Sequence, residues 1–374
     1  MPLHLIQTLP EYSDLIERLR LEPLVAVDTE AASFHRHKDR VYLLQLSTRT
    51  ETHLVDPLAV AGLPGFGELL ADPAIELVFH DADYDLRLLG YEFGFRAATL
   101  FDTRIAAQFL NEPGIGLAAM LEKYVGVTPD KRFQRADWSV RPLTQPMLEY
   151  AAMDTRHLPV LRDILRDRLT ERGKLTWAEE EFALATAVRW PAPESPEVAA
   201  LSMKGARALS PRGLAVFREL YVWRTRTAET LDRAAFRIIG NEALIALAER
   251  TPKDAAGLAA IPGVGKDLVE RRGKEILDAI ERGLQVPEAD LPRFPRAARY
   301  RNDPAFDGRL ERLKALRVRL VGELDLQPGV IAPNWLLEGV AREAPRSMEE
   351  LGKVDGIRRW QIAQFGKELL GAVI

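Results

Sequence analysis

Two acidic side chains stand close together in an otherwise apolar stretch, VAVDTEAASF, at residues 25–34. Asp28 and Glu30 are separated by one residue, and a β-strand places residues i and i+2 on the same face. Both carboxylates therefore point the same way, where their charges repel each other unless a cation lies between them. A divalent metal ion is the usual solution, because hard cations bind carboxylate oxygens. The alternative is a strand end that carries two solvated acids.

Further acidic groups occur in two other segments. The apolar run IELVFH leads into three aspartates, Asp81, Asp83 and Asp85. Further along, Tyr150 and Asp154 are four residues apart, which places them on one face of a helix. Taken alone, this pair is an ordinary position on an amphipathic helix. Combined with the acids of the first stretch, it indicates a site built from carboxylates and one phenol.

The segments around these residues show strand signals first and helix signals later. Four β-rich runs, PLVAVDTE, RVYLLQLST, ETHLVDPL and IELVFH, come first. A helical pattern follows in DLRLLGYEFG and, after a short strand, in TLFDTRIAAQFL, and it dominates residues 142–189. We therefore expect a mixed α/β sheet with helices packed on it. This is the framework that must position the acidic side chains.

The second part of the chain contains an internal repeat with a shift of 93 residues. Without any gap, Leu231 and Asp232 fall on Leu324 and Asp325, and GKEIL at 273–277 falls on GKELL at 366–370. So many identical residues at one fixed shift predict two copies of one small helical domain. The Pro-rich stretch RWPAPESPEVAA at 189–200 predicts a linker ahead of them.

Composition limits the possible classes of protein. The 374 residues suggest two or three domains, and the absence of cysteine excludes disulfides and thiolate metal sites. No apolar run has the ~18 residues of a membrane span, and the N-terminus does not resemble a signal peptide, so a soluble cytoplasmic protein without a membrane partner is expected. Residues 1–190 carry a net charge of −8 and residues 191–374 a net charge of +4. This split hints at a metal-binding part joined to a nucleic-acid-binding part, although a difference of this size can also be accidental.

The three acidic segments resemble the motifs of the DEDD exonucleases, in the subclass with tyrosine in the third motif. The first motif is VAVDTE, the second FHDADYDL and the third YAAMD. The supporting stretches YLLQLS, FDTRIAAQFL and ADWSVRPLTQPMLEYAAMDTRHL match as well. The repeated unit resembles the helical domain shared by RecQ helicases and ribonuclease D (HRDC). An exonuclease domain followed by two such units resembles the arrangement of the ribonuclease D family, and the resemblance covers nearly the whole chain.

The resemblance implies roles for particular residues. The metal-binding carboxylates would be Asp28, Glu30, Asp85 and Asp154, and they would hold two divalent ions, Mg²⁺ or Mn²⁺. Tyr150 would complete the catalytic set by orienting the attacking water. Asp81 and Asp83 are better explained as acids at a helix start, where they suit the helix dipole.

A second group of residues suggests contacts with RNA. The stretch KRFQRADW mixes basic and aromatic side chains, which suits a single strand, and an arginine follows shortly after it. The candidate RNA-binding residues are Lys131, Arg132, Arg135, Trp138 and Arg141. A solvated loop that merely tolerates charge is the alternative.

The implied fold is an α/β exonuclease domain with a ribonuclease H-like mixed sheet and flanking helices, followed by two small all-α helical bundles. The expected bounds are 1–190 for the exonuclease domain, 191–208 for a linker, 209–286 for the first HRDC-like domain, 287–305 for a second linker and 306–374 for the second HRDC-like domain.

The implied function is a 3′-to-5′ exoribonuclease that releases mononucleotides by two-metal hydrolysis. Its expected partner is RNA with a single-stranded 3′ end, such as a tRNA precursor, and it is expected to act as a monomer. Two alternatives stay open. One is a DNA 3′-to-5′ exonuclease, because the same active site serves both polymers. The other is a catalytically silent protein that binds or tethers RNA.

Overall fold

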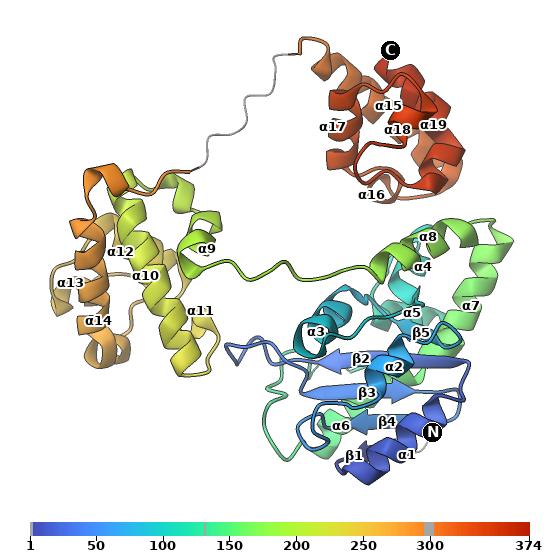
Figure 1. Ribbon diagram of the computed structural model, residues 1–374, viewed down its shortest axis with the longest axis horizontal. Coiled ribbons are helices and arrows are strands. Elements are labelled where there is room, and N and C mark those ends of the chain that lie inside the picture. The colour runs from blue at the N-terminus through green and yellow to red at the C-terminus, as the bar shows by residue number, and fades with distance from the viewer. Residues whose placement is uncertain (1–2, 131, 295–302) are drawn as a thin grey trace. The chain divides into compact units, whose positions relative to one another are not determined.

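The computed structural model describes residues 3–130, 132–294 and 303–374, and these residues form two units (Figure 1). The first unit contains the described residues of the ranges 1–31, 41–190 and 300–374. The second contains those of the ranges 32–40 and 191–299. Residues 295–302, which belong to the expected second linker at 287–305, lie outside the described residues, as does Lys131. No helix in the described ranges is both long enough and apolar enough to cross a membrane.

A six-stranded sheet forms the centre of the first unit, with the strand order β1-β4-β3-β2-β5-β6. β2 pairs antiparallel with β3 and parallel with β5, so the sheet is mixed, as the sequence predicts. β2 reads as a nearly continuous apolar run because it is central and covered on both faces. The strands are β1 (Leu3–Ile6), β2 (Leu24–Glu30), β3 (Leu43–Ser47), β4 (Thr52–Val55), β5 (Glu76–Phe79) and β6 (Phe101–Asp102).

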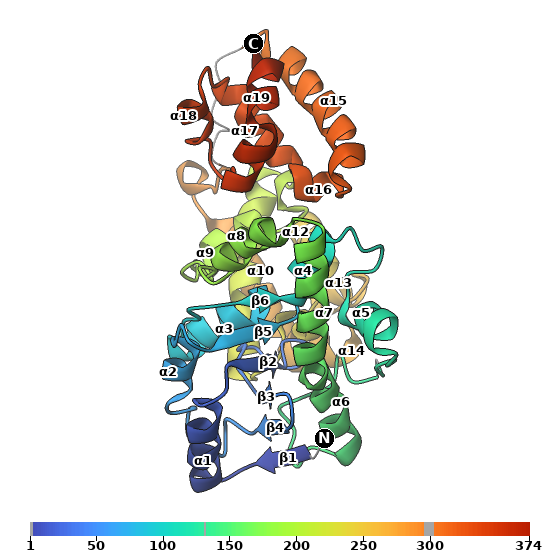
Figure 2. The same cartoon turned by 90° about the vertical axis from the view of Figure 1, so that its right-hand side faces the viewer.

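Helices cover both faces of this sheet. Figure 2 shows α1, α2 and α3 on one side and α5, α6 and α7 on the other. The helical pattern predicted for residues 142–189 forms α6, α7 and α8, and α6 crosses the central strands β2, β3 and β4. The helices of this part are α1 (Leu9–Leu19), α2 (Phe66–Leu70), α3 (Asp83–Phe93), α4 (Thr103–Phe109), α5 (Leu117–Val125), α6 (Gln145–Arg156), α7 (Leu158–Glu171) and α8 (Leu175–Ala185).

The internal repeat predicted from the sequence is present as two helical bundles with matching elements. The shift of 93 residues places α11 on α16 and α12 on α17 with identical bounds. The helices of the first repeat and the segment before it are α9 (Pro196–Ser202), η1 (Ala206–Ala208), α10 (Pro211–Thr230), α11 (Ala235–Ile238), α12 (Asn241–Arg250), α13 (Ala255–Ala259), α14 (Lys266–Gln285) and η2 (Glu288–Asp290). Those of the second repeat are α15 (Phe306–Leu324), α16 (Pro328–Ile331), α17 (Asn334–Glu343), α18 (Met348–Leu351) and α19 (Arg359–Val373).

One pair of hydrogen bonds is conserved between the two repeats. In the first repeat the guanidinium of Arg224 donates to the side-chain oxygen of Asn241, at 2.6 Å. In the second, Arg317 donates to the side-chain oxygen of Asn334, at 2.9 Å. Each arginine also donates to the carbonyl two residues before its asparagine. The same interaction therefore ties the long first helix of each bundle to the start of its third helix.

The second repeat packs against α8 within the first unit. The rings of Trp177 and Trp360 are stacked, with centroids 5.1 Å apart. Glu180 accepts hydrogen bonds from the backbone N–H groups of Arg359 and Trp360, at 2.7 and 2.9 Å. These are N–H groups in the first turn of α19, which has no partners of its own for them. A side chain of the sheet-containing part thus caps a helix of the second repeat.

The loop 32–40, which follows β2, groups with the first repeat and not with the sheet. The sequence places this loop inside an exonuclease domain of residues 1–190, because nothing in it signals a long-range contact. In the structure Ala234 N–H donates to the carbonyl of His35, and His37 N–H donates to the Asp232 carboxylate. This part of the chain therefore departs from the predicted domain assignment.

The capping role of Glu180 gives a testable expectation. Glu180→Ala should lower the free energy of unfolding by about 1 kcal/mol, because two N–H groups of α19 lose a charged acceptor. Glu179→Ala is the matched control, since among the described residues Glu179 makes only an exposed ion pair with Arg166 at 3.8 Å. Denaturant unfolding followed by tryptophan fluorescence compares the two variants, and an equal effect of both substitutions would contradict the capping role.

Candidate active site

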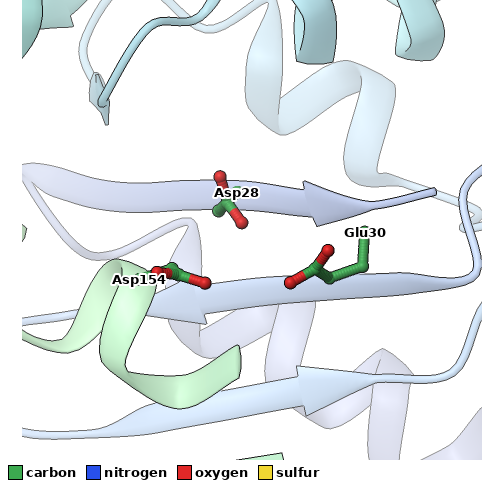
Figure 3. Close-up of side chains that lie close together, drawn as sticks. All are labelled: Asp28, Glu30 and Asp154. Carbon is green, nitrogen blue, oxygen red and sulfur yellow. The ribbon is translucent and has the colours of Figure 1, made fainter. Parts of the chain in front are cut away.

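Three of the predicted acids converge on one point of the sheet. Asp28 and Glu30 lie on the same face of β2, and Asp154 reaches them from α6. Each offers a carboxylate oxygen, and these oxygens lie within 4.8 Å of one another. Figure 3 shows the three carboxylates turned toward a common space. The strand spacing thus places Asp28 and Glu30 on one face, and the last turn of α6 brings Asp154 beside them. This is the convergence of acids that the sequence predicts.

The fourth predicted acid, Asp85, lies beside this group in the first turn of α3. Its Oδ1 atom accepts two hydrogen bonds from Thr29, one from the backbone N–H at 3.0 Å and one from the hydroxyl at 2.5 Å. Thr29 stands between Asp28 and Glu30 and points to the opposite face of the strand. It is therefore the residue that fixes Asp85 relative to the other acids. Sequence reasoning missed this role, although its position between two functional acids was a signal.

Burial disfavours ionisation of all four acids, and the charges of neighbouring acids add to this effect for Asp28, Glu30 and Asp154. Burial raises the pKa of Asp28 well above its ordinary value, and the charges of Asp85 and Asp154 raise it further. Burial likewise raises the pKa of Glu30, again with help from neighbouring acids. It raises the pKa of Asp85 and of Asp154 to about 7, against the effect of the Thr29 hydrogen bonds on Asp85. A positive charge favours the ionised form of buried acids, and a divalent cation bound between them would supply it.

Tyr150 lies one turn before Asp154 on α6. Its ring contacts those of Phe133 and Trp138, with centroids 5.9 and 6.1 Å apart. Burial and the nearby carboxylates raise the pKa of Tyr150 above its ordinary value, so the hydroxyl keeps its proton and can donate a hydrogen bond. A cavity of about 150 Å³ adjoins Tyr150 and Asp154. It offers space beside the acids for part of a substrate.

Asp102 organises the start of α3 and of α4 together. Its Oδ1 accepts from the backbone N–H groups of Arg104 and Ile105, which caps α4. The same carboxylate accepts from the backbone N–H groups of Asp81 and Ala82, immediately before α3. Asp102 therefore caps α4 and also fixes the residues that precede α3. It holds the segment that leads to Asp85.

Gln45 on β3 is the cross-strand partner of Asp28. Directly opposed residues of an antiparallel pair share a face, so its amide lies on the face that carries the acids. Ser47, two residues on, confirms this direction, because its hydroxyl lies 2.8 Å from that of Thr155 on α6. The Gln45 side chain is fully buried, and neither of its amide atoms has a hydrogen-bond partner among the described residues.

Comparison with known proteins places this arrangement in a family. A family model described as 3′-5′ exonuclease matches residues 3–170, and a model of the HRDC domain matches residues 213–280 and 306–373. Ribonuclease D of Gluconacetobacter diazotrophicus is 32% identical over 98% of this chain and 91% of its own length. The chain belongs to the ribonuclease D family. It is a hydrolytic 3′-to-5′ exoribonuclease, and enzymes of this kind depend on divalent metal ions.

A solved structure and a more distant relative extend this likeness. The crystal structure of Escherichia coli RNase D is 26% identical, covers 100% of this chain and 99% of its own, and gives a TM-score of 0.75. The human exosome complex component 10 is 32% identical over 76% of this chain, which corresponds to 33% of that protein. The ribonuclease D arrangement of one exonuclease domain and two HRDC domains therefore extends along this chain.

Two of the residues predicted to bind RNA are used inside the protein. Trp138 is 1% exposed and packs beside Tyr150. Arg141 donates to both carboxylate oxygens of Asp56 and to the carbonyls of Tyr42 and Trp138. Both side chains thus have contacts within the fold that the sequence does not reveal, and their contact with RNA stays a prediction.

The other three candidates differ in what the structure says of them. Arg132 forms an exposed ion pair with Asp130 and borders the cavity beside Tyr150, so it stays a candidate for RNA contact. Arg135 lies in the same described loop. Lys131 lies outside the described residues.

The raised pKa values determine how the metal-free ribonuclease D-like site responds to pH. In the unfolded chain an aspartate ionises near its ordinary pKa of ~3.9, whereas folded Asp85 and Asp154 hold protons up to about pH 7. The folded state therefore binds more protons between these values. The stability that the cluster contributes is complete below about pH 4 and is lost as the pH rises to about 7.

We therefore expect the melting temperature of the unaltered protein, measured with a chelator, to fall between about pH 5 and 7.5. The fall should be less steep for Asp154→Asn, because this substitution removes one of the acids that repel each other. Mg²⁺ or Mn²⁺ should raise the melting temperature more at pH 7.5 than at pH 5, because ions bind the deprotonated acids. Thermal unfolding across a pH series tests both points. Parallel pH profiles for the two proteins would contradict the account.

Proposed function

We propose that this enzyme removes mononucleotides from the 3′ end of RNA by two-metal hydrolysis at Asp28, Glu30, Asp85 and Asp154. The observation that carries the proposal is the convergence of three carboxylates within 4.8 Å, with Asp85 beside them. The residues fit the ions they would hold. All donors are carboxylate oxygens, which Mg²⁺ and Mn²⁺ prefer, and the raised pKa values of the acids support binding of positive charge between them.

The chemistry at this site divides between the ions and the protein. When bound by the four acids, two such ions would lower the pKa of a water and stabilise charge on the leaving oxygen. The chain itself contributes fixed positions for the four acids, because β2 and Thr29 hold Asp28, Glu30 and Asp85, and α6 holds Asp154. Tyr150 keeps its proton and donates a hydrogen bond that orients the attacking water. All of these groups come from one chain, which supports activity as a monomer.

The substrate we propose is RNA with a single-stranded 3′ end on a structured body, such as a tRNA precursor. The solved relative from Escherichia coli is described as an exoribonuclease involved in structured RNA processing, and this supports the choice. The cavity beside Tyr150 and Asp154 is about 150 Å³, which suits an unpaired end better than a duplex. A 3′-extended tRNA should therefore be trimmed to the edge of its folded part.

The preference for RNA over DNA and the release of single nucleotides can be measured in one experiment. Oligomers of identical sequence in RNA and DNA, incubated with Mg²⁺, with Mn²⁺ or with chelator, separate the proposal from its alternatives. RNA should be shortened one nucleotide at a time from the 3′ end, and only with metal. Equal or faster digestion of DNA would replace the proposal with a DNA exonuclease, and binding without digestion would replace it with a tethering protein.

The role of the acid cluster predicts a separation of catalysis from binding. Asp28→Asn should abolish hydrolysis while RNA affinity changes little, because this acid holds metal for the reaction. The matched control is Asp83→Asn, since Asp83 lies in the same motif but is exposed and paired with Arg87. Single-turnover digestion and filter binding measure the two properties. Substantial turnover by Asp28→Asn would exclude the two-metal assignment.

Tyr150→Phe should have a smaller effect. The substitution removes one hydroxyl and keeps the ring against Phe133 and Trp138. If the hydroxyl orients the water, kcat falls roughly tenfold, which corresponds to about 1.4 kcal/mol, while KM stays nearly constant. An unchanged kcat would show that Tyr150 only fills space beside the acids.

A further inference from the structure

The loop after β2 and the start of α11 form one exposed surface that the catalytic assignment does not use. We refer to it as the basic aromatic surface, and its main residues are Phe34, Arg36, Lys38, Arg233, Phe236 and Arg237. All of them belong to the second unit, in which the loop and the first repeat pack together. Figure 1 shows the loop beyond β2 lying beside α11.

Several contacts hold this surface together. Arg237 donates from Nε to the carbonyl of Phe34, at 2.5 Å. Asp232 accepts from the backbone N–H of His37 at 3.3 Å and forms an ion pair with Arg36 at 3.5 Å. These bonds join residues that are about 200 positions apart in the chain. The surface is therefore built by the fold and is not a stretch of unrelated loop.

Two aromatic rings stand at its centre. Phe34 and Phe236 meet edge to face, with ring centroids 6.3 Å apart. Even so, they remain 45% and 54% exposed. Burying these rings in a core would have been more favourable, so their exposure needs a reason. Nucleobases stack on exposed aromatic side chains of this kind.

The charge around these rings is positive. Residues 34–40 and 232–237 together carry five Lys or Arg side chains and two Asp side chains, with a net charge of +3. One of the acids, Asp232, is already engaged by Arg36 and His37. Lys38 and Arg233 are exposed and form no ion pair with any described residue. The surface thus attracts a polyanion rather than an apolar protein partner.

Its place in the chain relates it to the catalytic acids. Phe34 follows Glu30 by four residues, and an extended chain of that length spans at most about 14 Å. A single strand bound by such surfaces covers roughly 4–16 nucleotides. An RNA whose 3′ end lies at the acid cluster therefore has upstream nucleotides within reach of this loop.

We propose that the basic aromatic surface binds the single-stranded RNA upstream of the bond that is cut, with Phe34 and Phe236 stacking on bases and Lys38 and Arg233 meeting phosphates. The proposal rests on the proposed exoribonuclease function, to which it adds a binding site for the single-stranded RNA. It also assigns the RNA contact to a region other than the stretch 131–141 that the sequence favours.

The first test measures binding without hydrolysis. Fluorescence anisotropy in chelator compares an RNA of about twelve nucleotides with one of three, for the full chain and for the double variant Phe34→Ala/Phe236→Ala. The longer RNA should bind at least about tenfold more weakly to the variant, as expected for lost stacking, and the shorter RNA should bind equally. Trp335→Ala is the control, because Trp335 is also 54% exposed but lies in the second repeat, and it should leave both affinities unchanged.

The second test addresses the charges. Lys38→Ala/Arg233→Ala should reduce the slope of log affinity against log salt by about 1.4 for the longer RNA, since each phosphate contact on a single strand contributes about 0.7. With metal present, both double variants should raise KM for the longer RNA and leave kcat unchanged. Thermal unfolding verifies that the variants remain folded, and Phe34→Tyr/Phe236→Tyr should restore affinity because the rings are kept.

These measurements separate the proposal from the function on which it rests. If the protein degrades no RNA, the anisotropy arm still reports whether the surface binds a strand in a length-dependent way. Equal loss of affinity for both RNA lengths, an unchanged salt slope, or a loss of kcat with constant KM would overturn the proposal. Competition by an acidic peptide as strong as that by RNA would also overturn it, in favour of a protein partner.

Discussion

The mutual repulsion of four buried carboxylates is the constraint on which the rest of this structure depends. Such a cluster opposes its own formation, so rigid elements must hold each member. β2 is central, apolar and covered on both faces, which fixes Asp28 and Glu30. α6 crosses three strands and delivers Asp154. Two hydrogen bonds from Thr29 hold Asp85, and Asp102 secures the turn before α3 with the same carboxylate that caps α4. The sheet and the helices packed on it thus hold acidic side chains close together in spite of their like charges.

Local periodicity made much of this predictable from the sequence. The strand spacing of Asp28 and Glu30 and the helical spacing of Tyr150 and Asp154 each specify a shared face, and the structure brings these faces together. The shift of 93 residues predicted the two bundles, whose third helices have identical bounds under that shift. These features could be predicted because each depends on residues close together in the sequence or on comparing one part of the sequence with another.

Contacts between segments far apart in the sequence could not be predicted in this way. Trp138 and Arg141 have the chemistry of RNA-binding residues, but the fold buries one and pairs the other with Asp56. The docking of loop 32–40 on α11 joins segments about 200 residues apart, and no local pattern announces it. Gly240 in the first repeat stands where the second has Pro333, yet both precede a helix with nearly the same backbone angles. Residue type alone therefore shows neither which side chains the fold buries nor whether two different residues adopt the same backbone conformation.

The bond between Arg237 and Phe34 also has a consequence for the order in which the protein is made. The two residues are 203 positions apart, and a ribosome adds roughly 5–20 residues per second. The loop after β2 is thus complete some 10–40 s before the helix that holds it leaves the ribosome. All four acids and Tyr150 precede residue 155, so they are synthesised well ahead of residues 232–237. During this interval a nascent chain can carry its whole acid cluster while the loop beside Glu30 still lacks its support.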